Sequence, residues 1–359
     1  MTEPRAESSA TIGEAGEKAY LAQLLPRLTR HEFFENGFGD DAAVIVPANY
    51  LGALVHKIDR AARPVALDYD PTDFASWGRM AVTANCSDIL ACGATPVSFM
   101  IAVLAPPDQA AAEIDRIILA ADRECSARGI AFAGGDLKES STLEVIGSAV
   151  GTVAPRAALT RNGTRPGDTI YCAGLVGGFA AANLILSEPG VNLGDELRSE
   201  CVRYLSRPVA QWDDGQAIGR SGLATAAMDA SDGLFDVLSV LADGRLGVVV
   251  DLDHDGYHPL TAVCEKYTGI DHRAQMFGAG DWNIVYAVSP DHVPAFERLT
   301  EGRPVFRIGE AVEGSDIVGK SDGRQITIRP LVHEHFRQRI EQAGGFLDII
   351  RAGGLLDWS

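Results

Sequence analysis

Short apolar runs alternate with segments of helical periodicity along most of the 359 residues. Strand-like runs occupy residues 40–47, 50–59, 97–106, 130–136 and 143–153, and the segments between them at 71–93 and 108–129 repeat apolar residues at helical spacing. Each pattern places the apolar residues on one face of a strand or helix, and that face must be buried against another element. The first half therefore predicts a sheet covered by helices.

The second half repeats this alternation after a boundary rich in Pro, Gly and Arg at residues 154–168. A strand, a Gly-rich turn and a helix follow in 169–186, and a strand, an acidic turn and a helix occupy 224–243. We expect two α+β domains, 1–155 and 156–330, followed by a C-terminal helix and tail in 331–359. The helix of that last part is expected in 333–344.

The charge balance restricts the partners of the chain. It has 31 basic and 49 acidic residues, a net charge of −18, and neither nucleic acid nor an anionic membrane surface attracts such a protein. The N-terminus lacks the pattern of a signal peptide, and there is no long apolar segment, so a cytoplasmic protein is expected. The scattered cysteines are expected to be small buried side chains: Cys86, Cys92, Cys125, Cys172, Cys201 and Cys264.

Aspartates recur at the ends of apolar elements or inside them. They are Asp40 and Asp41 ahead of the first strand, Asp59, Asp88, Asp136, Asp229 and Asp232. Ionised carboxylates in apolar surroundings are costly, and neighbouring ones repel each other unless a cation is present. Oxygen-rich sites suit Mg²⁺, which often also binds substrate phosphates. These residues are therefore candidate magnesium ligands.

Each aspartate also has a simpler interpretation. Asp41 and Asp88 could accept hydrogen bonds from turn backbone, and Asp232 could cap the helix that follows it. Gly-rich turns at 133–136 and 173–179 could bring backbone N–H groups close to phosphate oxygens. Arg161 and Arg165 could supply positive charge for phosphate, or could be exposed linker residues.

The order of these motifs resembles that of thiamine-monophosphate kinases. The motifs are "GDDAAVIV", the "ID" of Asp59, "NCSDILACGATP", "GGD", "TRNGTRPGDTIYCAG", "MDASDGL" and "GAGDWNIVYAV". They extend over roughly residues 12–315. The wider superfamily includes aminoimidazole ribonucleotide synthetase, selenophosphate synthetase and the hydrogenase-maturation carbamoyl dehydratase.

The resemblance implies an α+β fold of two domains, whose N-terminal domains pair across a homodimer into a β-barrel flanked by helices. ATP and Mg²⁺ would bind in the cleft. Metal would be held by Asp40, Asp41, Asp59, Asp88, Asp136, Asp229 and Asp232, and ATP would contact Gly135, Asp136, Arg161 and Ser231. Asp59 or Asp281 would position or deprotonate a small-molecule acceptor, and the residues do not decide between them.

Two positions depart from the pattern of the family. Ala66 stands where a substrate-binding His is expected, and Gly280 replaces a Glu that faces the substrate. The sequence therefore predicts an ATP-dependent kinase whose acceptor is a different small polar metabolite. Two alternatives stay open: a synthetase that activates an amide with ATP, and a non-catalytic nucleotide-binding protein.

Overall fold

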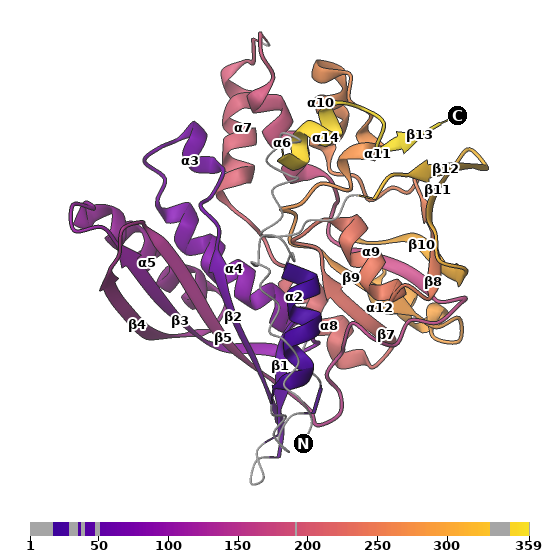
Figure 1. Ribbon diagram of the computed structural model, residues 1–359, viewed down its shortest axis with the longest axis horizontal. Coiled ribbons are helices and arrows are strands. Elements are labelled where there is room, and N and C mark those ends of the chain that lie inside the picture. The colour runs from indigo at the N-terminus through magenta and orange to yellow at the C-terminus, as the bar shows by residue number, and fades with distance from the viewer. Residues whose placement is uncertain are drawn as a thin grey trace, which may run out of the picture.

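Two sheets, one from each half of the chain, lie against a shared layer of helices (Figure 1). The computed structural model describes residues 17–28, 35–36, 40–46, 51–190, 192–330 and 345–358. At the N-terminus, α2 (Glu17–Leu24) is followed by the 3₁₀ turn η1 (Leu25–Arg27). The mixed sheets and helices form an α+β fold, as the sequence predicted.

The first sheet has five strands in the order β1-β2-β5-β3-β4. The strands are β1 (Ala43–Ile45), β2 (Ala53–Ala61), β3 (Thr95–Ala105), β4 (Ala131–Glu139) and β5 (Glu144–Val153). Only β3 and β4 are parallel, and α5 (Ala111–Ala127) connects them, as a crossover between parallel strands requires. The short α3 (Ala66–Tyr69) precedes α4 (Ala75–Ala91).

Helix α4 is buried along almost its whole length, and small residues make this possible. Fifteen of its 17 residues are buried. A Cβ atom at Gly78 would lie 2.0 Å from the carbonyl oxygen of Ile117 on α5, so glycine lets the two helices approach. On β5, a Cβ atom at Gly147 would lie 2.3 Å from the Asn85 amide nitrogen. Any polar residue on α4 is therefore held at a fixed place between the two sheets.

The other face of the first sheet carries exposed apolar side chains. Ile58 on β2 and Met100 on β3 both lie opposite Ser148 of β5, and their exposed fractions are 70% and 49%. Residues that alternate with them along the strands, such as Val55 and Phe99, are fully buried on the helix side. Within a single chain the first sheet is open, and no described helix or strand covers its outer face.

The second sheet has eight strands in the order β13-β12-β11-β8-β10-β6-β9-β7. The strands are β6 (Thr169–Ala173), β7 (Ala224–Asp229), β8 (Leu246–Asp251), β9 (Ile284–Val288), β10 (Val305–Glu313), β11 (Ile317–Ser321), β12 (Arg324–Ile328) and β13 (Leu356–Asp357). Its helices are α6 (Gly178–Ser187), α7 (Asp195–Ser206), α8 (Trp212–Ser221), α9 (Leu234–Ala242), α10 (Pro259–Thr268), α11 (His272–Gln275), α12 (Val293–Thr300) and α14 (Gly345–Arg351).

Alternate residues of the second sheet belong to two different cores. Ile170 and Cys172 of β6 pack with α6, α9 and α10, whereas Tyr171 and Ala173 pack with α4, α8 and α12. This second core also contains residues of the first sheet, so α4 lies in a layer common to both sheets. The domain limits at residues 155 and 330 stay a prediction, although each sheet draws its strands from one side of residue 155, and β13 beyond 330 joins the second sheet.

Most elements expected from the sequence are present, and one expectation was wrong. The segment 130–136 does not end in a turn at Asp136, because β4 continues to Glu139. Parallel pairing to β3, with an irregularity after Phe99, carries the strand through Gly134 and Gly135. All six cysteines are buried, as expected. The helix expected in 333–344 lies outside the described residues. Among the described helices, none has the length and apolar character needed to span a membrane.

Candidate active site

Three of the expected aspartates meet where the two sheets approach each other. Asp41 precedes β1, Asp88 lies on α4 and Asp229 ends β7, and one carboxylate oxygen from each lies within 4.8 Å of the others. Their exposed fractions are 5%, 4% and 3%. The buried α4 brings Asp88 to this point from the first half of the chain, and the end of β7 brings Asp229 from the second half. The site therefore depends on both sheets.

Two basic residues approach this Asp cluster (Asp41, Asp88 and Asp229). The Lys57 Nζ atom on β2 lies 3.0 Å from an oxygen of Asp88 and 3.9 Å from one of Asp59. The Arg161 Nε atom donates a hydrogen bond of 2.9 Å to Asp41, and its backbone N–H donates one of 3.1 Å to Asp40. Three buried carboxylates thus face two cations.

The pKa values in the cluster reflect this excess of negative charge. Burial raises the pKa of Asp229 to about 7, and the neighbouring Asp41 adds to the shift. Burial and the charge of Asp229 raise the pKa of Asp88 well above its usual range, against the effect of Lys57. Burial disfavours the charge on Lys57, but Asp88 and Asp59 outweigh it and raise the pKa of that amine. An added cation would relieve the repulsion.

The donor set suits a divalent cation. Oxygen Oδ2 of Asp229 is buried and has no hydrogen-bond partner among the described residues, although a buried carboxylate oxygen normally has one. Three carboxylates that converge within 4.8 Å are oxygen ligands of the type that Mg²⁺ prefers. Asp41, Asp88 and Asp229 therefore fit a magnesium site. Another group of possible metal ligands, Glu265, Asp271 and His272, is less buried, and Arg273 already binds Asp271 through both carboxylate oxygens.

The remaining sequence candidates divide into those near the cluster and those away from it. Asp40 accepts a hydrogen bond of 3.0 Å from Asn36 and one from Arg161. Asp59 lies on the same face of β2 as Lys57, whose Nζ atom is 3.9 Å away, and the Asp59 side chain is 43% exposed. Asp232 follows in the turn before α9 and lies close enough to contribute to the raised pKa of Asp229.

Asp136 and Gly135 lie apart from the cluster within one chain. Asp136 is on the edge strand β4 with its side chain 60% exposed, 3.8 Å from Lys138. Asp136 pairs with Ala102 on β3. The residue before Ala102, Ile101, pairs with a residue of β5 that in turn pairs with Asp59 on β2. Successive residues of a strand point to opposite faces, so Asp136 and Asp59 are on opposite faces. A role of Asp136 in metal or nucleotide binding stays a prediction.

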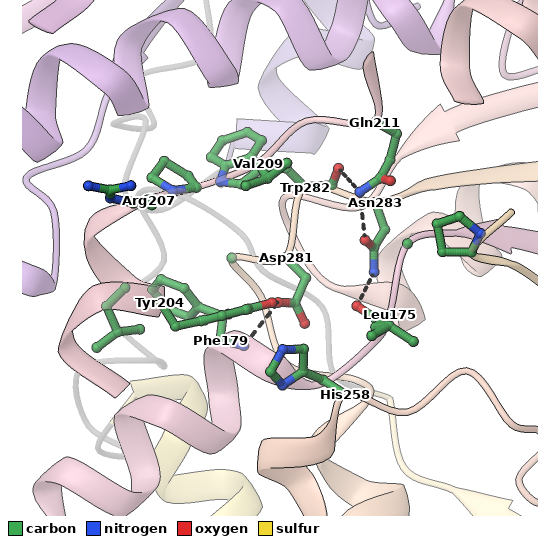
Figure 2. Close-up of a pocket in the computed structure, with 15 residues that line it drawn as sticks. Leu175, Phe179, Tyr204, Arg207, Val209, Gln211, His258, Asp281, Trp282 and Asn283 are labelled. Atoms are coloured by element: carbon green, nitrogen blue, oxygen red, sulfur yellow. Dashed lines mark hydrogen bonds between the residues drawn. The ribbon is translucent and has the colours of Figure 1, made fainter. Parts of the chain in front are cut away.

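Asp281 lines a pocket of about 240 Å³ in the second half of the chain (Figure 2). Its Oδ1 atom accepts hydrogen bonds from the backbone N–H of Phe179, at 2.9 Å, and the hydroxyl of Tyr204, at 3.1 Å. Burial raises the pKa of Asp281 to about 6, and hydrogen bonds from the start of α6 oppose the rise. Asp281 therefore holds the N-terminus of α6 and forms no part of the Asp cluster.

The two departures from the family pattern have different surroundings. Gly280 has a φ of +102°, and a Cβ atom there would lie 2.5 Å from the ring of Phe179. A larger residue would have to displace that ring, so Phe179 and Gly280 together shape one wall of the pocket. Trp282 is another lining residue, and its Nε1 donor is buried without a partner among the described residues. Ala66, by contrast, is fully buried in the core of the second sheet.

Backbone hydrogen bonds connect the pocket to the Asp cluster. The N–H of Gly280 donates to the carbonyl oxygen of Ser231 at 3.0 Å, and that of Ala230 donates to Asn283 at 2.8 Å. Strands β7 and β9 are neighbours, with Asp229 opposite Ile284. Ser231 thus links the segment that carries Asp229 to the segment that carries the pocket residues.

The sequence did not indicate several residues of the site. Lys57 was missed, although it lies two residues before Asp59 in a strand and must share its face. Tyr204 and His258 line the pocket, but nothing in their local sequence distinguishes them. They come from α7 and from the start of α10, and only the folded chain brings them together.

Comparisons with known proteins agree with this arrangement. The sequence profile described as AIR synthase related protein, N-terminal domain, matches residues 39–153. A thiamine-monophosphate kinase of Halobacterium salinarum is 34% identical over 295 residues, which cover 78% of this chain and 91% of that protein. The chain belongs to the thiamine-monophosphate kinase family.

Further relatives extend this likeness over nearly the whole chain. A thiamine-monophosphate kinase of Synechococcus elongatus is 29% identical over 346 residues, covering 93% of this chain and 94% of that protein. The structure described as AaThiL complexed with AMPPCP and TMP superposes with a TM-score of 0.74, at 21% identity, over 92% of this chain and 100% of that one. The chain thus has the fold of this kinase family.

Replacement of Asp229 should change how the metal-free protein responds to pH. The folded pKa of about 7 lies above the unfolded value of 3.8, so the folded state binds the extra proton between these values. Stability should therefore fall as pH rises from about 4 to 7. We expect Asp229→Asn to reduce this fall, measured as melting temperature in EDTA at pH 5 and pH 8. Asp108→Asn is the control, because Asp108 is exposed. An equal fall in melting temperature in the wild type and in both variants would contradict a buried, ionised Asp229.

Proposed function

We propose that this chain is an ATP- and Mg²⁺-dependent kinase of a small polar acceptor that differs from thiamine monophosphate. Membership of the kinase family supports the reaction class. The observation that carries the proposal is the convergence of Asp41, Asp88 and Asp229, with their oxygens within 4.8 Å of one another. Such a site would hold Mg²⁺ together with the phosphates of ATP.

The residues of the Asp cluster would divide the work of phosphoryl transfer. Asp41, Asp88 and Asp229 would hold the cation, and bound Mg²⁺ would stabilise negative charge on the transferred phosphoryl group. Lys57 and Arg161, which now neutralise the carboxylates, would become available to phosphate oxygens once a metal takes over that role. Asp59 is the better placed of the two candidate bases, because Asp281 already caps α6.

The acceptor would bind in the pocket of Phe179, Tyr204, His258, Asp281 and Trp282. Gly280 supports an acceptor other than that of the relatives, because the ring of Phe179 lies where a Glu side chain would begin. The aromatic walls suit a flat or apolar group. A polar anchor missing from a built site costs several kcal/mol of discrimination.

A conservative change of Asp88 tests the catalytic cluster. Asp88→Asn keeps the shape but removes one negative ligand, so we expect phosphoryl transfer from ATP to fall by at least about 10²-fold. Asp108→Asn provides the control, since its carboxylate is exposed and far along the chain from the cluster. The rate is measured as phosphorylated product. Activity of Asp88→Asn equal to that of the control would mean that Asp88 serves as a structural residue only.

The choice of acceptor can be tested by steady-state kinetics and product analysis. We expect thiamine monophosphate to be turned over weakly or not at all, while a panel of metabolites with γ-labelled ATP yields a stable phosphorylated product. A kcat/KM for thiamine monophosphate of about 10⁴ M⁻¹s⁻¹ or more would contradict the different acceptor. Release of free phosphate with a cyclised or dehydrated product would instead favour the amide-activating alternative.

We also propose that two chains pair through the outer face of the first sheet. Ile58 and Met100 expose apolar surface there, and an uncovered apolar sheet face favours association. Sedimentation should give about twice the mass of one chain at micromolar concentration, and Ile58→Lys should shift the protein toward monomers. Leu119→Lys on α5 is the control, because Leu119 is also exposed but lies outside this face. A monomeric wild-type protein would refute the pairing.

A further inference from the structure

Four arginines surround a hollow on the side of residues 207–209 that adjoins α4 and α5. Arg79 comes from α4, Arg123 and Arg128 from the end of α5, and Arg207 from the segment between α7 and α8. The hollow has a volume of about 360 Å³. This concentration of positive charge is unexpected in a chain with 31 basic and 49 acidic residues. We name it the arginine pocket.

Arg123 and Arg207 are exposed, and unlike the other two arginines of the pocket they have no carboxylate partner among the described residues. Arg79 binds Asp73 at 3.1 Å, and Arg128 approaches Glu124 at 3.4 Å. Four positive charges therefore face two negative ones. Arg123 and Arg207 thus leave the pocket with two positive charges that form no ion pair among the described residues.

The walls of the arginine pocket are held in place from both halves of the chain. The Nε atom of Arg79 donates a hydrogen bond of 2.8 Å to the carbonyl oxygen of Ser206, one residue before Arg207. The guanidinium of Arg128 lies 5.1 Å from the ring centre of Trp212 on α8. These contacts fix Arg79 and Arg128 across the junction of the two halves. A ligand that binds here would contact both.

We propose that the arginine pocket binds a phosphate group. Two unpartnered guanidinium groups match a phosphate dianion in charge, and each can donate paired hydrogen bonds to its oxygens. A single carboxylate would neutralise only one of them. On α4, Arg79 precedes Asp88 by nine residues, about 13 Å at the rise of an α-helix. A phosphate in the arginine pocket would therefore be separate from the ATP phosphates expected at the Asp cluster.

The arginine pocket and the acceptor pocket share one wall. Arg207, Pro208 and Val209 line both. Figure 2 shows Arg207 at the margin of the acceptor pocket, with its guanidinium group turned away from Asp281. The inference goes beyond the proposed kinase function and does not rest on it, because it requires neither ATP nor Mg²⁺.

Calorimetry of inorganic phosphate binding in EDTA at low ionic strength tests the proposal. EDTA keeps the Asp cluster free of metal, so its carboxylates repel anions and only the arginine pocket should bind. We expect a dissociation constant below about 10 mM for the wild-type protein. Arg123→Gln and Arg207→Gln should each weaken binding at least about tenfold, since each removes one of the two unpartnered charges.

Arg324→Gln is the matched control, because Arg324 on β12 is exposed and has no ion pair among the described residues. It should bind phosphate as the wild type does, and melting curves should show all variants folded. Glycerol phosphate distinguishes the sources: tighter binding than inorganic phosphate indicates a phosphorylated metabolite, and equal binding indicates the free ion. No binding by the wild type, unchanged binding in Arg123→Gln, or acetate binding as tightly as phosphate would overturn the proposal.

Discussion

Mutual repulsion among three buried carboxylates is the constraint on which this structure depends. Asp41, Asp88 and Asp229 are almost inaccessible to solvent, and two cations, Lys57 and Arg161, only partly offset their charge. Burial of such groups costs free energy that the surrounding fold must supply. The buried helix α4 meets this cost through close packing against both sheets, which its small residues permit. The chain thus maintains an unfavourable charge arrangement at the junction of its halves.

The two ends of the candidate active site differ in how closely they follow the family. The aspartates of the cluster stand at the positions that the family motifs predict, and the chain is 34% identical to a family member over most of its length. The pocket end has Gly280 packed beneath the ring of Phe179. The segments that carry Asp229 and Gly280 are hydrogen-bonded through Ser231, so backbone contacts join the pocket end to the metal end.

The sequence predicted the elements better than it predicted their contacts. Strand alternation and helical spacing located β2, α4 and α5, because those patterns record which face each element buries. The extension of β4 through Asp136 was missed, since adjacent glycines resemble a turn until a neighbouring strand pairs with them. Tyr204, His258 and the four arginines could not be grouped at all. Their proximity arises from the packing of α4, α5, α7 and α10, which leaves no local signal in the chain.

Calorimetric titration with a non-hydrolysable ATP analogue, with and without Mg²⁺, tests the central claim most directly. If the Asp cluster is a cation-dependent nucleotide site, binding should require Mg²⁺, because the bare carboxylates repel the triphosphate. Asp88→Asn should weaken the Mg²⁺-dependent binding, and Asp108→Asn should leave it unchanged. Equal affinity for the analogue in Mg²⁺ and in EDTA would contradict the account, because it would show that the three carboxylates meet for a purpose other than holding a cation.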